Sequence, residues 1–202
     1  MNDESSLTKS NDTHLTSKVI EESISYEINS PQNKASKNQI IDAISLNLED
    51  IIKDNYCYEK YIIKDKFYLP IIPEISINDY INRIVKNTNM NISTLINSII
   101  YIDNYCERNK YILCWHNIHL ILLTSCLLSF KFNEDNLLNM EFYAKIGGIP
   151  LQTLNHLEYL FYLNLHFSLY IKEDLYSFYY NYFSNYLFPS KIKCEKILDN
   201  NL

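Results

Sequence analysis

Glycine is nearly absent from the chain. The 202 residues contain only two glycines, which are adjacent, Gly147 and Gly148. Tight hairpin turns depend on glycine, and no stretch alternates apolar and polar residues as a half-buried strand does. The glycine-rich loops that bind nucleotide phosphates are missing too. These absences argue against hairpin-built folds and phosphate-binding loops, and they favour an all-α chain.

Arginine and excess positive charge are also scarce. The chain has two arginines, Arg83 and Arg108, and a formal net charge of -6. Proteins that bind nucleic acids usually carry a basic surface that neutralises phosphates, so we expect no nucleic-acid partner. The first twenty residues are polar and partly acidic, which predicts neither a signal nor a transit peptide. We therefore expect an intracellular protein, nuclear and/or cytoplasmic.

Paired cysteines and long apolar runs are missing as well. The five cysteines form no Cys-x-x-Cys pair, which predicts neither a disulfide framework nor a zinc ribbon. The most apolar run, residues 118–130, falls short of the roughly 20 residues that a membrane span needs. It predicts a buried helix, and we expect no membrane association.

Composition divides the chain into five parts. Residues 1–38 are rich in Ser, Asn, Thr, Lys and Glu and predict a mostly disordered polar arm. An N-terminal helix and connector are expected over 39–75, a central helical unit over 76–170, a C-terminal helix over 171–188 and a tail over 189–202.

Apolar residues recur at helical spacing through most of the chain. We take Ser76, Ser93 and Asn117 as candidate N-caps of the helices that they precede. The pattern predicts helices over 40–52, 76–85, 93–106, 118–131, 140–146, 151–161 and 173–187.

The glycine pair directly follows the predicted helix 140–146. A residue just past a helix end often takes a left-handed backbone conformation, which glycine adopts without the Cβ penalty. We therefore expect Gly147 or Gly148 to end that helix.

Motifs for chemistry are few. Cys114, His116 and His119 are metal-ligand types, but no further Cys or His follows at a useful short spacing. We expect them to pack and hydrogen-bond at a helix start, and a metal site is only a third alternative. No motif for nucleophilic catalysis is present, so we expect neither an enzyme nor a cofactor.

Two charged residues lie beside apolar helix faces, Lys131 and Glu158. Spacing alone predicts that each is an ordinary solvated charge at the edge of such a face. The residues by themselves indicate a compact helical domain that binds another protein.

Six stretches, in order and with compatible spacing over about residues 40 to 185, resemble the cyclin box of the P-type cyclins, also called U-type, which are relatives of the yeast phosphate-signalling cyclin. They are Pro73-Glu-Ile-Ser-Ile-Asn-Asp-Tyr-Ile-Asn-Arg-Ile84, Ile100-Tyr-Ile-Asp103, Asn117-Ile-His119, Ser129-Phe-Lys-Phe132, Tyr143-Ala-Lys-Ile-Gly-Gly148 and Leu154-Asn-His-Leu-Glu158. The resemblance implies one five-helix cyclin box, with an extra helix on each side.

The resemblance also implies a function. Such a cyclin binds and activates a cyclin-dependent serine/threonine kinase by stabilising the active position of its C-helix, in cell-cycle or nutrient and phosphate signalling. By resemblance, Lys131 and Glu158 grip the kinase, and Phe132, Tyr162 and Leu169 pack on its helix. The alternative is a cyclin-fold scaffold with a non-kinase partner.

Two departures from the family pattern affect structural residues. The family's Tyr-Ile-Asp-Arg is Tyr-Ile-Asp-Asn here, so Asp103 lacks its usual arginine neighbour and Arg83 becomes the candidate partner. Pro150 stands where Ser or Thr usually caps the fifth helix of the box; proline is tolerated at a helix start but offers no capping side chain.

Overall fold

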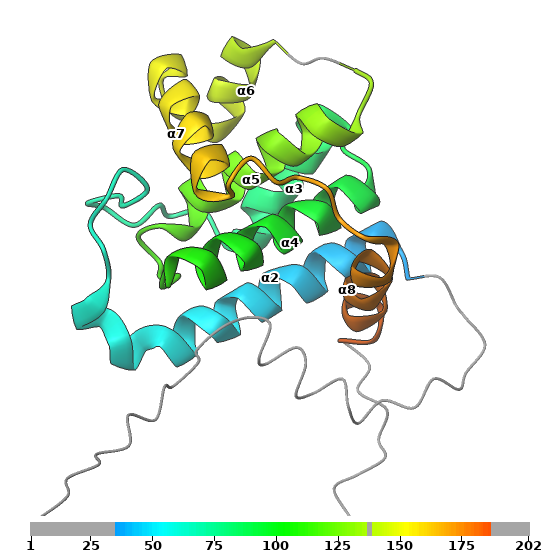
Figure 1. Ribbon diagram of the computed structural model, residues 1–202, viewed down its shortest axis with the longest axis horizontal. Helices are drawn as coiled ribbons and strands as arrows, with labels where there is room; N and C mark the ends of the chain where they lie inside the picture. Colours follow the sequence, from blue (N-terminus) through cyan, green and yellow to red (C-terminus); the bar gives the residue numbers. More distant parts are fainter. Residues whose placement is uncertain (1–34, 137–138, 187–202) are drawn as a thin grey trace, which may run out of the picture.

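The computed structural model describes residues 35–136 and 139–186 (Figure 1). These residues form helices and no strand, so the predicted all-α class is confirmed. The helices are α2 (Lys37–Asp54), η1 (a 3-10 helix, Asn55–Tyr61), α3 (Ile77–Thr88), α4 (Ile92–Asn109), α5 (Ile118–Asn133), α6 (Met140–Gly147), α7 (Leu151–Asn164) and α8 (Glu173–Tyr186). Most of the predicted arm and all of the predicted tail lie outside the described residues, and the five-part division stays a prediction.

Helix α5 is the central element. Every residue from Ile118 to Phe130 is buried, which explains why the sequence of this helix is apolar on all sides. It packs against α3, α4, α6 and α7. The approach of α4 is close because small side chains lie between them: the Ser129 hydroxyl donates a hydrogen bond to the Thr94 carbonyl at 2.6 Å.

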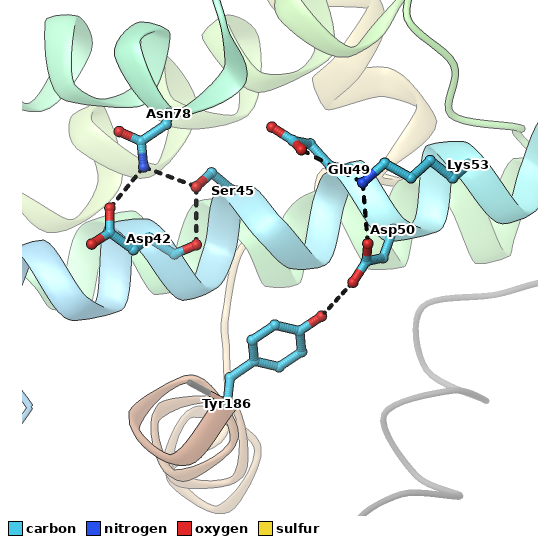
Figure 2. Close-up of polar contacts among 7 residues, drawn as sticks. All are labelled: Asp42, Ser45, Glu49, Asp50, Lys53, Asn78 and Tyr186. Atoms are coloured by element: carbon cyan, nitrogen blue, oxygen red, sulfur yellow. Dashed lines mark hydrogen bonds and ion pairs between the residues drawn. The ribbon is translucent and has the colours of Figure 1, made fainter. Parts of the chain in front are cut away.

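Helices α2 and α8 lie on the opposite side of the molecule from α6 and α7 (Figure 1). Figure 2 shows how α2 is tied to its neighbours by polar contacts. The Asn78 amide on α3 donates to Asp42 at 2.8 Å and to Ser45 at 2.9 Å, and the Tyr186 hydroxyl on α8 donates to Asp50 at 3.0 Å. The two outer helices therefore form one layer against α3 and α4.

The helix starts match the predicted caps in part. The Ser76 side chain accepts a hydrogen bond from the Asp79 amide, as an N-cap should. Ser93 was the wrong choice for α4, since the helix begins earlier and Asn91 is its N-cap. Asn117 is the N-cap residue of α5 but makes no side-chain capping bond.

The connector before α3 is held down by two imidazoles. His116 Nδ1 lies 2.7 Å from the Leu69 carbonyl oxygen, and its ring stacks on Tyr68. His119 Nε2 lies 3.0 Å from the Ile75 carbonyl oxygen. These contacts give both histidines a structural role in fixing the connector against the start of α5.

The two glycines meet different needs at one turn. Gly148 follows α6 with φ of 71°, the left-handed conformation that disfavours a side chain, and its N–H bonds to the carbonyls at the end of α6. Gly147 is still helical, but a Cβ there would overlap the Cδ2 of Leu123 on α5. One glycine therefore permits the turn and the other permits close packing on α5.

Candidate functional site

An ion pair joins the exposed end of α5 to the middle of α7. Lys131 Nζ lies 2.6 Å from Glu158 Oε1, although the two residues are 27 positions apart in the chain. The Lys131 side chain is 39% exposed and that of Glu158 is 20% exposed. Pairs this accessible contribute only about 0.2–1 kcal/mol to stability. Both charges thus remain available to a partner.

The packing of α7 on α5 brings the pair together. Helix α7 buries Leu154, Leu157 and Phe161, and all three are on the face that meets the core. Glu158 follows Leu157 and so lies at the edge of this face, toward the last turn of α5. The turn at the glycines sets the direction of α7, which makes it part of the site's architecture.

The end of α5 is anchored to the start of α4 by Glu134. This carboxylate accepts hydrogen bonds from the Asn91 backbone N–H at 3.0 Å, the Asn91 side-chain amide at 2.7 Å and the Thr94 hydroxyl at 2.5 Å. It therefore satisfies the backbone N–H of the N-cap residue Asn91, and its negative charge suits a helix N-terminus. Sequence reasoning missed this residue, because its partners lie about forty positions earlier.

A second contact reinforces this anchor. The Asn97 side-chain amide on α4 donates to Asn133 Oδ1 at 3.2 Å, and Asn133 donates back to the Ser129 carbonyl of its own helix at 2.7 Å. Lys131 and Phe132 lie between these anchored residues. Their backbone is therefore held in place while their side chains point outward.

Two of the three predicted apolar residues, Phe132 and Leu169, lie together at a groove. Phe132 is 55% exposed, and it lines a groove of about 440 Å³ with Leu169. The Leu169 carbonyl accepts a hydrogen bond of 2.7 Å from the buried Tyr101 hydroxyl, which fixes the link between α7 and α8. Tyr162 lies outside the groove lining, one turn after Glu158, and packs edge-on against Phe167.

Arg83, the candidate partner of Asp103, makes its hydrogen bond at another place. Arg83 donates to the Lys145 carbonyl at 3.1 Å, at the end of α6. Asp103 is buried and accepts a 2.5 Å hydrogen bond from Tyr179 of α8. Burial and the nearby Asp103 charge raise the pKa of Tyr179, so the phenol stays a neutral donor. A tyrosine on the flanking helix thus supplies a polar partner for Asp103.

The alternative metal site finds no support in the geometry. Across residues 35–136 and 139–186, no group of three or more His, Cys, Asp or Glu side chains could hold a metal ion. Burial lowers the pKa of His119, whose Nε2 is engaged by the Ile75 carbonyl. In the same part of the chain, no helix combines the length and the apolar character that crossing a membrane requires.

These observations define a helical protein with an anchored, charged surface where α5 meets α7. A family model described as Cyclin matches residues 2–169, and the chain belongs to the cyclin family. Membership implies a regulatory role. The expected five-helix box with flanking helices agrees with the all-α fold that the structure has.

Named relatives support the P-type or U-type resemblance. The chain is 37% identical to Cyclin-U4-3 of Arabidopsis thaliana over 98 residues, which cover 48% of this chain and 45% of the relative. It is 32% identical to Cyclin-P3-1 of Oryza sativa subsp. japonica over 130 residues, covering 64% and 53%. Cyclin-P4-1 of the same plant is 35% identical over 98 residues, covering 48% and 46%. The chain spans about half the length of these curated relatives.

Proposed function

We propose that this cyclin binds and activates a cyclin-dependent serine/threonine kinase through Lys131 and Glu158. The observation that carries the proposal is the 2.6 Å ion pair between them, at the two positions that the cyclin resemblance assigns to kinase binding. Phe132 is exposed and Tyr162 and Leu169 are half-buried, so all three offer apolar surface to a partner. A specific protein interface combines charged groups, which fix the register of the two partners, with apolar surface, which contributes affinity.

Activation would proceed by a shift in the kinase's conformational population. A cyclin that binds only the conformation with the kinase C-helix in its active position stabilises that conformation by its differential affinity. The repositioned helix lets its glutamate pair with the lysine that aligns ATP phosphates. The cyclin contributes binding energy and no reacting group, and the process served is cell-cycle control or nutrient and phosphate signalling.

The anchored geometry supports this mechanism. Because Glu134 and Asn133 hold the end of α5, the backbone that carries Lys131 and Phe132 needs little reordering on binding. Prior ordering lowers the entropic cost of association. Once covered by a partner, the ion pair loses water, and removal of one member then costs about 2 to 5 kcal/mol of binding.

The test is co-expression of the chain with a panel of cyclin-dependent kinases, followed by measurements of binding and phosphorylation. Lys131→Glu should abolish both and leave the thermal midpoint nearly unchanged. Lys53→Glu is the matched control, since Lys53 is an exposed lysine that also pairs with carboxylates, Glu49 at 3.7 Å and Asp50 at 3.4 Å (Figure 2). The control should bind and activate normally.

The double variant Lys131→Glu/Glu158→Lys separates recognition from stability. It restores an internal ion pair but presents reversed charges to the kinase, so we expect native stability without binding. Full binding by the double variant would show that only the internal pair matters and would refute the proposed interface. If the native chain binds no kinase of the panel, the scaffold function with a non-kinase partner replaces the proposal.

A further inference from the structure

The groove beside Phe132 extends well beyond the residues assigned to kinase binding. It runs from the first turns of α4, past the end of α5, to the first turn of α8. Its volume is about 440 Å³, and its lining residues are Ser93, Asn97, Phe132, Asn133, Leu169, Tyr170, Ile171, Glu173 and Tyr176.

One part of the lining is apolar or aromatic. Phe132, Leu169, Ile171 and the rings of Tyr170 and Tyr176 supply surface for a hydrocarbon chain. Aromatic rings of this kind also attract a cation placed over their faces. This part of the groove is continuous with the proposed kinase interface, because it shares Phe132 and Leu169 with it.

The other part is rich in hydrogen-bond acceptors. Glu173 contributes a carboxylate that has no hydrogen-bond or ion-pair partner among the described residues. Asn97 gives its amide nitrogen to Asn133, so its oxygen remains as an acceptor. Ser93 adds a hydroxyl. None of the lining residues is a cation, so the carboxylate is not neutralised within the groove.

We propose that this groove receives a lysine or arginine side chain of the bound kinase, and that Glu173 helps to select kinases which carry one there. The inference rests on the proposed kinase-binding function and adds the chemistry of a second contact. A lysine or arginine has a hydrocarbon stem that fits the apolar wall and a cationic head that suits the acceptors.

A purely apolar occupant fits the lining less well. It would cover Glu173 and the Asn97 oxygen without replacing the hydrogen bonds that water makes to them, and a buried unpaired polar group costs binding energy. A cationic head removes this penalty and gains the attraction of opposite charges. The composition of the groove therefore favours the cation.

The test compares Glu173 with its neighbour Asp174. Both are acidic residues in the first turn of α8, but only Glu173 lines the groove. The dissociation constant of the kinase that binds the native chain is measured for Glu173→Gln, Glu173→Lys, Asp174→Asn and Asp174→Lys. We expect Glu173→Gln to weaken binding about two- to fivefold and Glu173→Lys about tenfold or more.

The control variants should stay within about twofold of the native chain, because exposed charges outside an interface matter little. The loss caused by Glu173→Lys should shrink as salt is raised, since added ions screen the contact. Equal affinities for the Glu173 and Asp174 variants would overturn the inference. So would a Glu173→Gln variant that binds as tightly as the native chain while Phe132→Ala binds weakly, because the occupant would then be apolar.

A rescue experiment identifies the partner residue. Surface lysines and arginines of the kinase are changed singly to glutamate, and each variant is tested against native and Glu173→Lys cyclin. One kinase variant should bind Glu173→Lys more tightly than it binds the native chain. Absence of any such reversal contradicts the cationic contact. Failure of the native chain to bind any kinase is a separate result, which refutes the proposed function itself.

Discussion

Helices α5 and α7 meet at the candidate site but differ in how they belong to the fold. Helix α5 is buried from Ile118 to Phe130 and exposes only its last turn, whereas α7 buries three residues, Leu154, Leu157 and Phe161. A buried helix has its position fixed by packing on all sides. The half-exposed helix offers surface. The site needs both helices, because α5 holds its position in the core and α7 presents exposed surface beside the end of α5.

Two local features maintain the packing of α7 on α5 and the position of the end of α5. The glycine turn sets α7 on α5, and the Glu134 carboxylate holds the end of α5 on α4. The glycine turn acts where α6 packs on the buried part of α5, and the Glu134 carboxylate acts at the exposed end of α5. Substitutions at each should therefore have different consequences for folding and for binding.

The largest effect is expected at Gly147, where α6 packs on α5. Gly147→Val should lower the free energy of unfolding by about 3 kcal/mol, because the new side chain overlaps a Leu123 side chain that is fully buried. Kinase binding should fall with stability, since Glu158 moves away from Lys131. Urea denaturation with a binding assay measures both.

A double-mutant cycle checks the cause. Gly147→Ala and Leu123→Ala should each destabilise the fold, but the double variant should lose less than the sum, because the added methyl group occupies space that the leucine vacated. Simple additivity would contradict the clash.

Gly148→Val should cost about 1–2 kcal/mol, because a branched side chain is strained at the left-handed φ of 71°. The space around this residue is open, so steric overlap with other residues adds nothing. Gly148→Asn tolerates the conformation better and should recover most of the loss in a thermal unfolding assay. A Val variant as stable as the native chain would show that the turn does not require glycine.

Glu134→Ala tests the exposed end of α5. Loss of its hydrogen bonds to the start of α4 should cost about 1 kcal/mol of stability. Ser36→Ala is the matched control, because Ser36 and Gln39 form a capping box on α2, away from the site. Both variants should unfold more easily, but only Glu134→Ala should weaken kinase binding, by about fivefold. Equal binding by the two would make Glu134 purely structural.

The smallest effect concerns pH at the buried start of α5. Burial lowers the pKa of His119, so the unfolded chain takes up a proton that the folded chain excludes. This contribution to stability is present above the unfolded pKa of about 6.5 and is lost as pH falls below it. His119→Gln should flatten the stability profile between about pH 7.5 and 5.5.

His156→Gln, on the exposed face of α7, serves as the comparison for His119→Gln. Urea midpoints at several pH values provide the measurement. A native slope in His119→Gln would mean that other groups, such as carboxylates, dominate.

Local patterns were enough for the helices. The spacing of apolar residues predicted α3, α5 and α7 close to their observed bounds, because the amphipathic repeat and the caps involve residues only three or four positions apart. The prediction failed where the start of a helix depends on a residue far away in the chain. We chose Ser93 as the N-cap of α4, but the N-cap is Asn91, whose backbone N–H donates to Glu134.

The sequence by itself determined the all-α class, the order of the helices and, through resemblance, the pair Lys131 and Glu158. Only the tertiary structure decided that Tyr179 donates to Asp103 and Arg83 to the Lys145 carbonyl, that Gly147 is required by Leu123, and which residues share the groove. The physical reason is the separation in sequence of the residues that interact. Helix formation depends on neighbours along the chain, whereas partners 24 to 76 positions apart meet only when the core has packed.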